Sequence, residues 1–231
     1  MNEASAPRRR IRSFVKRAGR LTPGQQQALQ TLWPEYGIEH DGSLLDLAGL
    51  FPQARGVALE IGFGNGESLL EMAEADPQTG FIGIEVHEPG VGHCLRGIAE
   101  RGLDNLRLMS DDAMDILRDA IPGASLERIQ LYFPDPWHKK RHHKRRIVNA
   151  EFRDQAARVL RPGGLLHMAT DWQDYAEHMA AELLGDARFE NIGDDRGYAP
   201  QPSWRPETKF ERRGKRLGHG VWDLLFRRIE G

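Results

Sequence analysis

From residue 56 onwards, short apolar runs alternate with segments of helical periodicity, and this alternation restricts the possible fold more than any other feature. The apolar runs have strand length and occupy residues 57–61, 81–84, 105–109, 129–133 and 165–169. Because strands joined by helices form βαβ units, the pattern predicts an α/β domain with a parallel sheet and helices packed on it. Two later runs, 189–192 and 221–229, are expected to add an antiparallel edge.

A basic arm precedes this domain. Between Ala4 and Pro34 the chain contains no Asp or Glu, but it carries Arg8, Arg9, Arg10, Arg12, Lys16, Arg17 and Arg20. A length of 231 residues suits one domain with a substantial core better than two. We therefore divide the chain into residues 1–34, a basic arm with a short helix, and residues 35–231, a single domain. A polar stretch at about 194–220 is expected to be a functional or disordered loop.

Composition excludes several classes of protein. One cysteine, Cys94, excludes an intrachain disulfide and is typical of a reducing compartment. No apolar stretch approaches the ~20 residues of a membrane span, and the arginine-rich start lacks the apolar core of a secretory signal. We expect a cytoplasmic protein without a membrane partner, either a monomer or a homodimer. The net charge of -2 hides basic segments in the arm, at 139–146 and at 205–216, which makes nucleic acid a candidate partner.

The first predicted strand ends at an acid and a glycine-rich loop that opens the next helix. The acid is Glu60, and the glycines are Gly62, Gly64 and Gly66. Glycines in this position let the backbone approach a ligand at a helix N-terminus. The spacing G-x-G-x-G differs from the dinucleotide fingerprint. An acid before the glycines would repel a pyrophosphate but suits the zwitterionic amino-acid end of S-adenosylmethionine.

Two further acids follow the next two strands. Glu85 comes directly after the second strand, where it could accept both ribose hydroxyls, and Asp112 follows the third strand, near the expected adenine edge. Ligands of open α/β sheets bind outside the carboxyl ends of the strands, so these acids and Glu60 are predicted to line one crevice. The alternative is that each acid merely caps the following helix. The ordered set with the glycines favours a cofactor site.

The fourth strand leads into the most unusual stretch of the chain. Two prolines flank Asp135 and end the strand, which fixes this carboxylate at the tip. A run of Lys, Arg and His follows, comprising Lys139, Lys140, Arg141, His142, His143, Lys144, Arg145 and Arg146. Because the run adjoins the candidate site and repeats the charge of the arm, we interpret it as an RNA-binding segment rather than a solvated loop. Its histidines lack partners with metal-ligand spacing, so no metal is assigned.

The motifs together resemble those of the bacterial tRNA (guanine-N7-)-methyltransferases, the TrmB-like enzymes. The resemblance spans residues 59–222 and is carried by 59–66, 83–87, 133–139, 144–146, 169–172, 208–211 and 218–222. It implies a Rossmann-like class I S-adenosylmethionine-dependent methyltransferase fold, with a mostly parallel seven-stranded sheet, helices on both faces and an antiparallel edge strand.

The same resemblance implies a reaction and a set of roles. The reaction is methylation of N7 of the variable-loop guanine (position 46) of tRNA, with Asp135 as catalytic residue. Cofactor binding falls to the positions Glu60, Glu85, Asp112 and Asp135. Substrate contact falls to Lys139, Asp171, Thr208, Lys209, Phe210 and Glu211.

Two other functions remain open from the sequence. One is a methyltransferase for another nucleobase or for protein, because residues 134–137 resemble the Asn-Pro-Pro-Tyr signature of amino-group methyltransferases, with an acid in place of the amide. The other is a noncatalytic RNA-binding module on a methyltransferase-like fold. The complete glycine loop and acid set argue against this second possibility.

Overall fold

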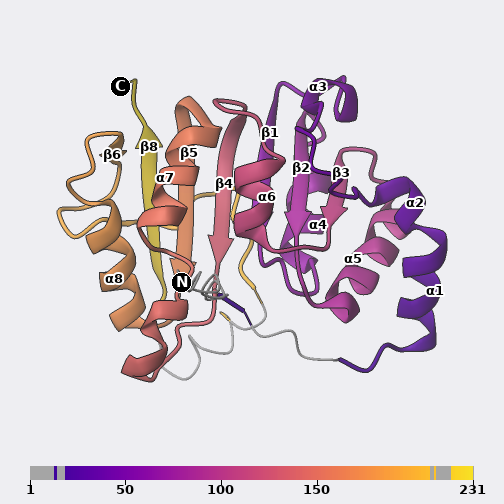
Figure 1. Ribbon diagram of the computed structural model, residues 1–231, viewed down its shortest axis with the longest axis horizontal. Helices are drawn as coiled ribbons and strands as arrows, with labels where there is room; N and C mark the ends of the chain where they lie inside the picture. Colours follow the sequence, from indigo (N-terminus) through magenta and orange to yellow (C-terminus); the bar gives the residue numbers. More distant parts are fainter. Residues whose placement is uncertain (1–12, 15–18, 209–210, 212–219, 231) are drawn as a thin grey trace, which may run out of the picture.

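The computed structural model describes residues 13–14, 19–208, 211 and 220–230. One mixed sheet runs through the domain in the order β3-β2-β1-β4-β5-β8-β6, and β7 pairs with β8 off this path (Figure 1). The strands are β1 Gly56–Ile61, β2 Thr79–Ile84, β3 Leu106–Met109, β4 Leu126–Tyr132, β5 Leu160–Thr170, β6 Phe189–Asn191, β7 Tyr198–Ala199 and β8 Trp222–Arg228.

The first five strands are parallel, whereas β8 pairs antiparallel with β5, β6 and β7. The predicted mostly parallel sheet with an antiparallel edge is therefore confirmed. β7 adds an eighth strand because Tyr198 and Ala199, expected within a loop, pair with Leu224 and Asp223 of β8. A second difference concerns the strand predicted at 165–169, because β5 begins already at Leu160 and its register against β4 shifts before Leu165.

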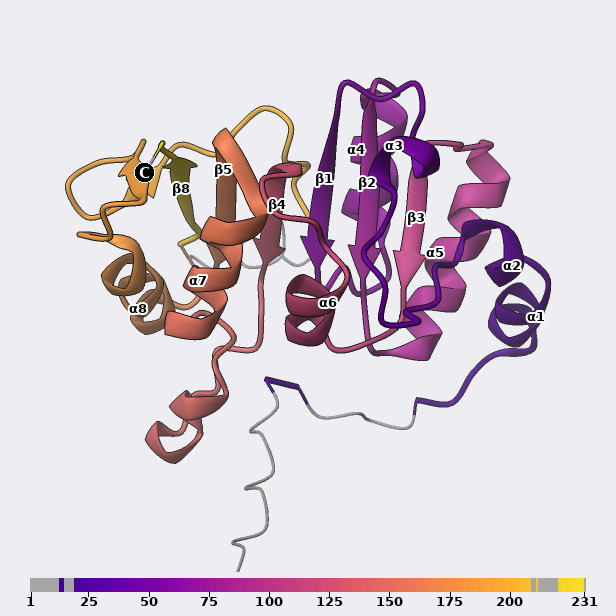
Figure 2. The same cartoon turned by 45° about the horizontal axis from the view of Figure 1, so that its top comes forward.

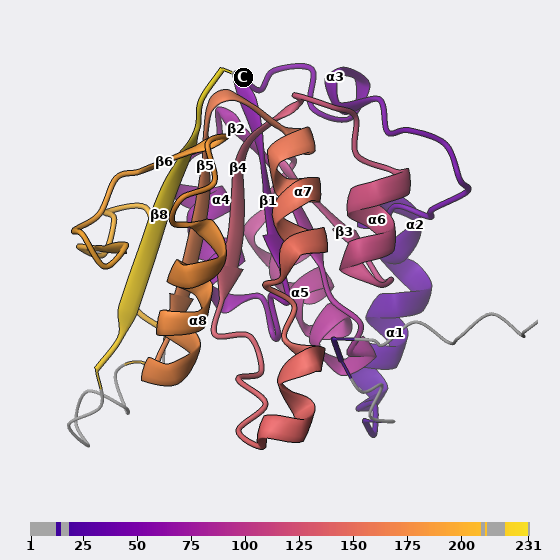
Figure 3. The ribbon, with the colours of Figure 1, turned by 60° about the vertical axis from the view of Figure 1, so that its left-hand side comes forward.

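Helices cover both faces of the sheet (Figures 1 and 3). Buried residues of α6, α7 and α8 belong to the core on one face, and those of α4 and α5 belong to the core on the other, where α1 packs on α5. The helices are α1 Pro23–Thr31, α2 Trp33–Tyr36, α3 Leu47–Leu50, α4 Glu67–Ala75, α5 Glu88–Arg101, α6 Ala113–Asp119, α7 Ala150–Val159 and α8 Gln173–Leu183, with the 3-10 helix η1 Lys140–Arg145.

Local sequence accounts for where several helices begin. Thr22 and Gln25 form a capping box at α1, with the Gln25 amide donating to the Thr22 hydroxyl at 3.3 Å and Gln25 Oε1 accepting from the Thr22 amide at 2.9 Å. Asn149 caps α7 by accepting from the Phe152 amide at 3.1 Å. These caps fix the helices on a sheet whose central strands are almost fully buried.

The strand order indicates where a ligand can bind. β1 lies between β2 and β4, so the connections that leave β1 and β3 run to opposite sides of it. Such a reversal opens a crevice at the carboxyl ends of the strands. η1 projects from this same end of the sheet (Figures 2 and 3). In the described part of the chain, no helix is both long and apolar enough to cross a membrane.

Candidate active site

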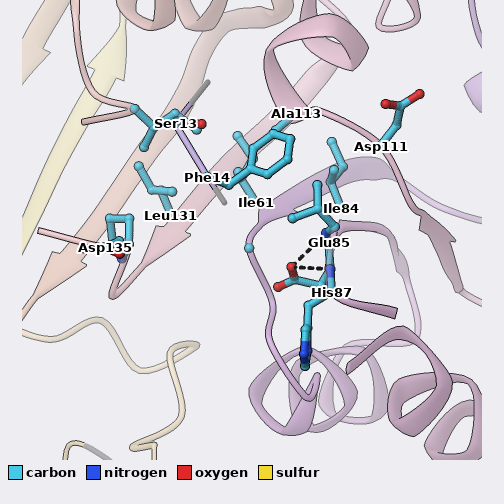
Figure 4. Close-up of a pocket in the computed structure, with 14 residues that line it drawn as sticks. Ser13, Phe14, Ile61, Ile84, Glu85, His87, Asp111, Ala113, Leu131 and Asp135 are labelled. Carbon is cyan, nitrogen blue, oxygen red and sulfur yellow. Dashed lines mark hydrogen bonds between the residues drawn. The ribbon is translucent and has the colours of Figure 1, made fainter. Parts of the chain in front are cut away.

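A cavity of about 420 Å³ lies at the carboxyl ends of β1, β2 and β4 (Figure 4). Its apolar walls come from Ile61, Ile84 and Leu131, the last or next-to-last residues of these strands, and from Ala113 at the start of α6. Its polar lining includes Gly62, Glu85, Asp111 and Asp135. Of the three acids predicted to line one crevice, Glu85 lines this cavity, whereas Glu60 and Asp112 are not among its lining residues.

The three glycines after β1 do different things. Gly62 and Gly64 have positive φ angles of 74° and 60°, and a Cβ added to either would meet no atom within 4 Å. Gly66, with a φ of 78°, faces Cys94 of α5, whose Sγ would lie 2.4 Å from an added Cβ. The first two thus leave open space where a ligand can approach the backbone, while the third allows the start of α4 to pack on α5.

Glu60 is a buried acid with unsatisfied hydrogen-bonding capacity. Its side chain lies in the core with the residue 4% exposed, and Oε2 has no hydrogen-bond partner among the described residues. Burial, and then the charge of nearby Glu85, raise the pKa of Glu60 to about 8. Gln130, its register partner on β4, also has a buried oxygen, Oε1, without a hydrogen-bond partner in the part of the chain that the structure describes. Unpaired acceptors of this kind fit a ligand that brings hydrogen-bond donors.

Glu85 is fixed by backbone amides. Its Oε1 accepts from Val86 N at 2.7 Å and His87 N at 2.9 Å (Figure 4). Its Oε2 accepts from Gly64 N at 2.9 Å. These bonds tie the tip of β2 to the glycine loop after β1. The carboxylate therefore has one orientation at the cavity wall.

Asp112 caps a helix, as the alternative interpretation of this acid proposed. Its Oδ1 accepts from Met114 N at 3.1 Å at the start of α6, and the residue is 9% exposed. Its neighbours Asp111 and Ala113 line the cavity. Asp112 thus positions the wall on which these two residues lie.

The tip of β4 is held in an unusual backbone conformation. Phe133 and Trp137 have positive φ angles of 51° and 48°, which cost non-glycine residues about 1–3 kcal/mol each. Between them, Asp135 is exposed at the cavity, and its Oδ1 accepts from Trp137 N at 2.9 Å. The prolines, this turn and the strained residues together fix the carboxylate where the sequence predicted it.

Two residues of the N-terminal arm complete the cavity, which the sequence did not predict. Ser13 and Phe14 line it, and in Figure 4 the Phe14 ring lies in the middle of the lining residues. Trp137 Nε1 donates to Ser13 O at 3.2 Å, and the Arg145 guanidinium lies 5.0 Å from the Trp137 ring centroid. Trp137 thus packs within the site. The only signal for this contact was an aromatic residue within an otherwise basic arm.

The basic run divides into exposed and buried residues. Lys139, Lys140, Arg141 and Lys144 are exposed on or beside η1, while His142, His143 and Arg145 are half-buried. Burial, and then the surrounding cations, lower the pKa of His142. Arg146 differs from the others, because its side chain is 3% exposed, pairs with Asp174, donates to Pro136 O at 3.0 Å and lies over Tyr175. It anchors the run to α8.

The remaining predicted substrate residues lie in two places. Asp171 is exposed directly after β5, beside the β4 tip. Thr208 Oγ1 accepts from Glu211 N at 3.0 Å, and the Glu211 side chain is buried and bound to Arg205. Lys209 and Phe210 fall outside the described residues. Arg205 was not singled out by the sequence, because its two carboxylate partners cannot be recognised from spacing.

Comparison with known proteins identifies the family. Residues 54–224 match a family model described as putative methyltransferase. A tRNA (guanine-N(7)-)-methyltransferase from Alcanivorax borkumensis is 58% identical over 218 residues, which are 94% of this chain and 91% of that protein. The chain belongs to this methyltransferase family. Another relative of the same name, from Cronobacter sakazakii, is 55% identical over 229 residues, or 99% of this chain and 96% of that protein.

Solved structures agree on the fold of this methyltransferase. The aminoglycoside resistance methyltransferase NpmB1 superposes with a TM-score of 0.55 at 18% identity, covering 81% of this chain and 95% of that one. TrmN from Thermus thermophilus gives a TM-score of 0.52 at 15% identity, covering 89% of this chain and 48% of that one. The class I methyltransferase fold implied by the motifs is confirmed, and family and fold imply S-adenosylmethionine as methyl donor.

Proposed function

We propose that this enzyme transfers the methyl group of S-adenosylmethionine to N7 of the variable-loop guanine, position 46, of tRNA. The observation that carries the proposal is a single cavity lined both by Glu85, beside the open glycines, and by Asp135. The first part suits the cofactor and the second suits the base. The names of the curated relatives support the same reaction.

The cofactor side is matched to the donor groups of S-adenosylmethionine, which when bound supplies an electrophilic methyl group on sulfur. Glu60 accepts from the ammonium group, since its buried Oε2 lacks any other described partner. Glu85 accepts from a ribose hydroxyl, because a carboxylate offers about four acceptor sites and the backbone amides occupy three. Asp112 contributes by fixing Asp111 and Ala113 at the adenine end.

The chemistry of guanine N7 explains why one positioned carboxylate suffices. N7 carries a lone pair and no proton, so no base has to activate it, and the methylated ring is cationic. Asp135 accepts from the N1–H and N2–H groups of the base, as acids accept from base amino groups elsewhere, and its charge stabilises the positive ring. Orientation supplies most of the acceleration, up to ~7–11 kcal/mol in well-aligned systems.

The tRNA backbone is bound by the exposed cations of the basic run. Lys139, Lys140, Arg141 and Lys144 project with η1 from the end of the sheet that carries the cavity (Figure 2). Contacts of Lys and Arg with phosphates bring affinity without reading sequence. Asp171 and Thr208 complete the substrate side near the base, while Arg146 supports the run from below.

One experiment tests the reaction directly. The enzyme is incubated with methyl-labelled S-adenosylmethionine and unmodified tRNA, and the RNA is digested to nucleosides. We expect 7-methylguanosine from wild-type tRNA and none from a transcript with adenine at position 46. A different labelled nucleoside would indicate another target base. RNA binding without transfer would indicate the noncatalytic module.

A further inference from the structure

A chain of buried polar side chains links the loop before β8 to the underside of the active site. Arg205 lies at its centre with a side chain 1% exposed. Its guanidinium donates to Glu211 from Nη1 at 2.6 Å and Nη2 at 3.0 Å, and to Asp223 from Nε at 2.7 Å and Nη2 at 2.8 Å. One arginine therefore makes two bidentate ion pairs out of contact with water, the geometry for which its planar fork is suited.

The chain continues from Asp223 into the sheet. Asp223 Oδ1 accepts from His167 Nε2 at 2.7 Å. His167 Nδ1 lies 2.9 Å from the Tyr132 hydroxyl and 3.3 Å from Trp204 Nε1. An indole N–H can only donate, so Nδ1 accepts and Nε2 carries the proton. Burial lowers the pKa of His167 despite its bond to Asp223, which keeps the ring neutral. Each hydrogen bond of the network thus has a defined donor and acceptor, and Arg205 carries the positive charge of the network.

The same arginine lies against the strand that carries Asp135. Its guanidinium carbon is 5.8 Å from the Tyr132 ring centroid and 5.7 Å from that of Phe133. Phe133 is the residue with positive φ at the end of β4, and its amide donates to Ala169 O at 2.8 Å. Arg205 therefore lies against the rings of Tyr132 and Phe133, which lead into the turn that presents Asp135. It also binds Glu211, whose amide donates to Thr208 Oγ1.

We infer that Arg205 is a positioning residue for methyl transfer: it holds Glu211, with Thr208 bound to it, and the tip of β4 in one arrangement, in which the guanine is held in line with the methyl donor. The inference rests on the proposed function of this segment in substrate binding. Arg205 itself is buried, so its effect passes through Glu211 and Phe133.

The position of Arg205 predicts which kinetic constant changes. The exposed cations of η1 are not in its network, so phosphate binding and the KM for tRNA should be preserved. Glu85 and the open glycines are held by their own backbone contacts, so cofactor affinity should also be preserved. Replacing Arg205 should disturb the orientation of the bound base, which lowers kcat.

The test compares Arg205→Gln with the wild-type enzyme, with active sites counted by calorimetric titration with S-adenosylmethionine. Per cofactor-binding site, we expect kcat to fall about 100-fold, the effect of misplacing a reacting group by about 1 Å. The KM for tRNA and the Kd for S-adenosylmethionine should change by less than about threefold. Arg205→Lys keeps the positive charge but loses the planar guanidinium. Its kcat should be about tenfold higher than that of Arg205→Gln.

Arg188→Gln is the matched control. Arg188 also pairs with two carboxylates, Asp186 and Asp154, but it precedes β6 at the opposite end of the sheet. Its replacement should leave kcat unchanged. If Arg205→Gln yields too few cofactor-binding molecules, Asp223→Asn removes one of the two ion pairs and decides the question, with an expected fall in kcat of about tenfold.

The outcomes separate the inference from the proposed function. If wild-type enzyme makes no 7-methylguanosine, the proposed function fails. If wild-type enzyme is active and Arg205→Gln or Asp223→Asn turns over at the wild-type rate per cofactor-binding site, Arg205 has only a structural role and the inference is overturned. A fall in kcat that Arg205→Lys partly reverses, with both affinities preserved, supports positioning.

Discussion

The cofactor side and the substrate side of the active site are built in different ways. On the cofactor side, Glu85 is held by amides of the two residues that follow it and of Gly64, so neighbouring backbone fixes it. On the substrate side, Arg146 pairs with Asp174, and Arg205 with Asp223, so the segments are held by ion pairs between side chains. The first side is therefore fixed by hydrogen bonds to backbone amides and the second by ion pairs between side chains, so side-chain substitutions should affect the two sides differently.

The largest expected effect is at the boundary between the two sides. Asp135→Asn preserves an oxygen that can accept from the Trp137 amide but removes the charge facing the base. We expect kcat to fall by about 10²–10³, as for loss of one preorganised electrostatic contact elsewhere. Binding of tRNA, measured by filter retention at equilibrium, should be unchanged. Near-normal turnover would place the critical carboxylate elsewhere, with Asp171 the next to examine.

On the cofactor side, Glu60 predicts a proton-linked affinity. Its pKa of about 8 means that the carboxyl is protonated in the free enzyme at neutral pH, whereas pairing with an ammonium group requires the carboxylate. Cofactor binding should therefore release a proton, and affinity should rise as pH increases from 6.0 to 7.5, by up to about tenfold per unit. Calorimetry in buffers of different ionisation enthalpy measures this release directly.

Glu60→Gln is the matched variant for this linkage. It keeps the size of the side chain but cannot ionise, so we expect weaker cofactor binding, by about tenfold, with no proton release. In the free protein, the raised pKa means that the native state holds an extra proton between the ordinary value of 4.5 and about 8. Stability of the wild type should thus fall as pH rises through this range. A Glu60→Gln enzyme with wild-type proton release would rule out this acid.

On the substrate side, replacing Arg146 should lower the stability of the protein, whereas replacing its exposed neighbours should weaken tRNA binding. Arg146→Gln removes a buried guanidinium from Asp174, Pro136 O and the Tyr175 ring. Because Asp174 is 60% exposed and remains solvated, we expect a loss of about 2 kcal/mol in the free energy of unfolding. For a chain of this size that lowers the melting temperature by about 4–8 °C. A calorimetric scan measures it, and an unchanged melting temperature would contradict the anchoring role.

Much of the cofactor side was predictable because its signals are local. An acid directly after an apolar run marked the strand tip at Glu85, and two prolines that end a strand marked the tip at Asp135. The sequence could not separate Gly66, which packs on Cys94, from Gly62, which faces open space, because that difference depends on α5. Within the basic run, the sequence gives no reason to distinguish Arg145 from Arg146. Arg146 has a structural role because it pairs with Asp174 of α8.

The strand content was likewise predictable except where pairing is decided at long range. The apolar runs from 57 to 169 lie within β1 to β5, because strands that are buried on both faces are rich in apolar residues. Tyr198 and Ala199 form β7 only because β8 offers an edge there. The same predicted loop contains Arg205, whose partners Glu211 and Asp223 lie 6 and 18 residues away. No sequence pattern indicated these ion pairs.

The smallest expected effect comes from the exposed cations of the basic run, which can be compared with the buried Arg146. Replacing Lys140, Arg141 and Lys144 with alanine removes three exposed cations and leaves the buried anchor in place. If each contacts one phosphate, the slope of log K for tRNA against log salt should become shallower by about 2–3, while the melting temperature stays within the error of measurement. Arg146→Gln measured alongside should show the reverse, a lower melting temperature and a much smaller change of slope. If the triple variant keeps the wild-type slope, the tRNA backbone lies on another surface, and the basic arm becomes the next segment to test.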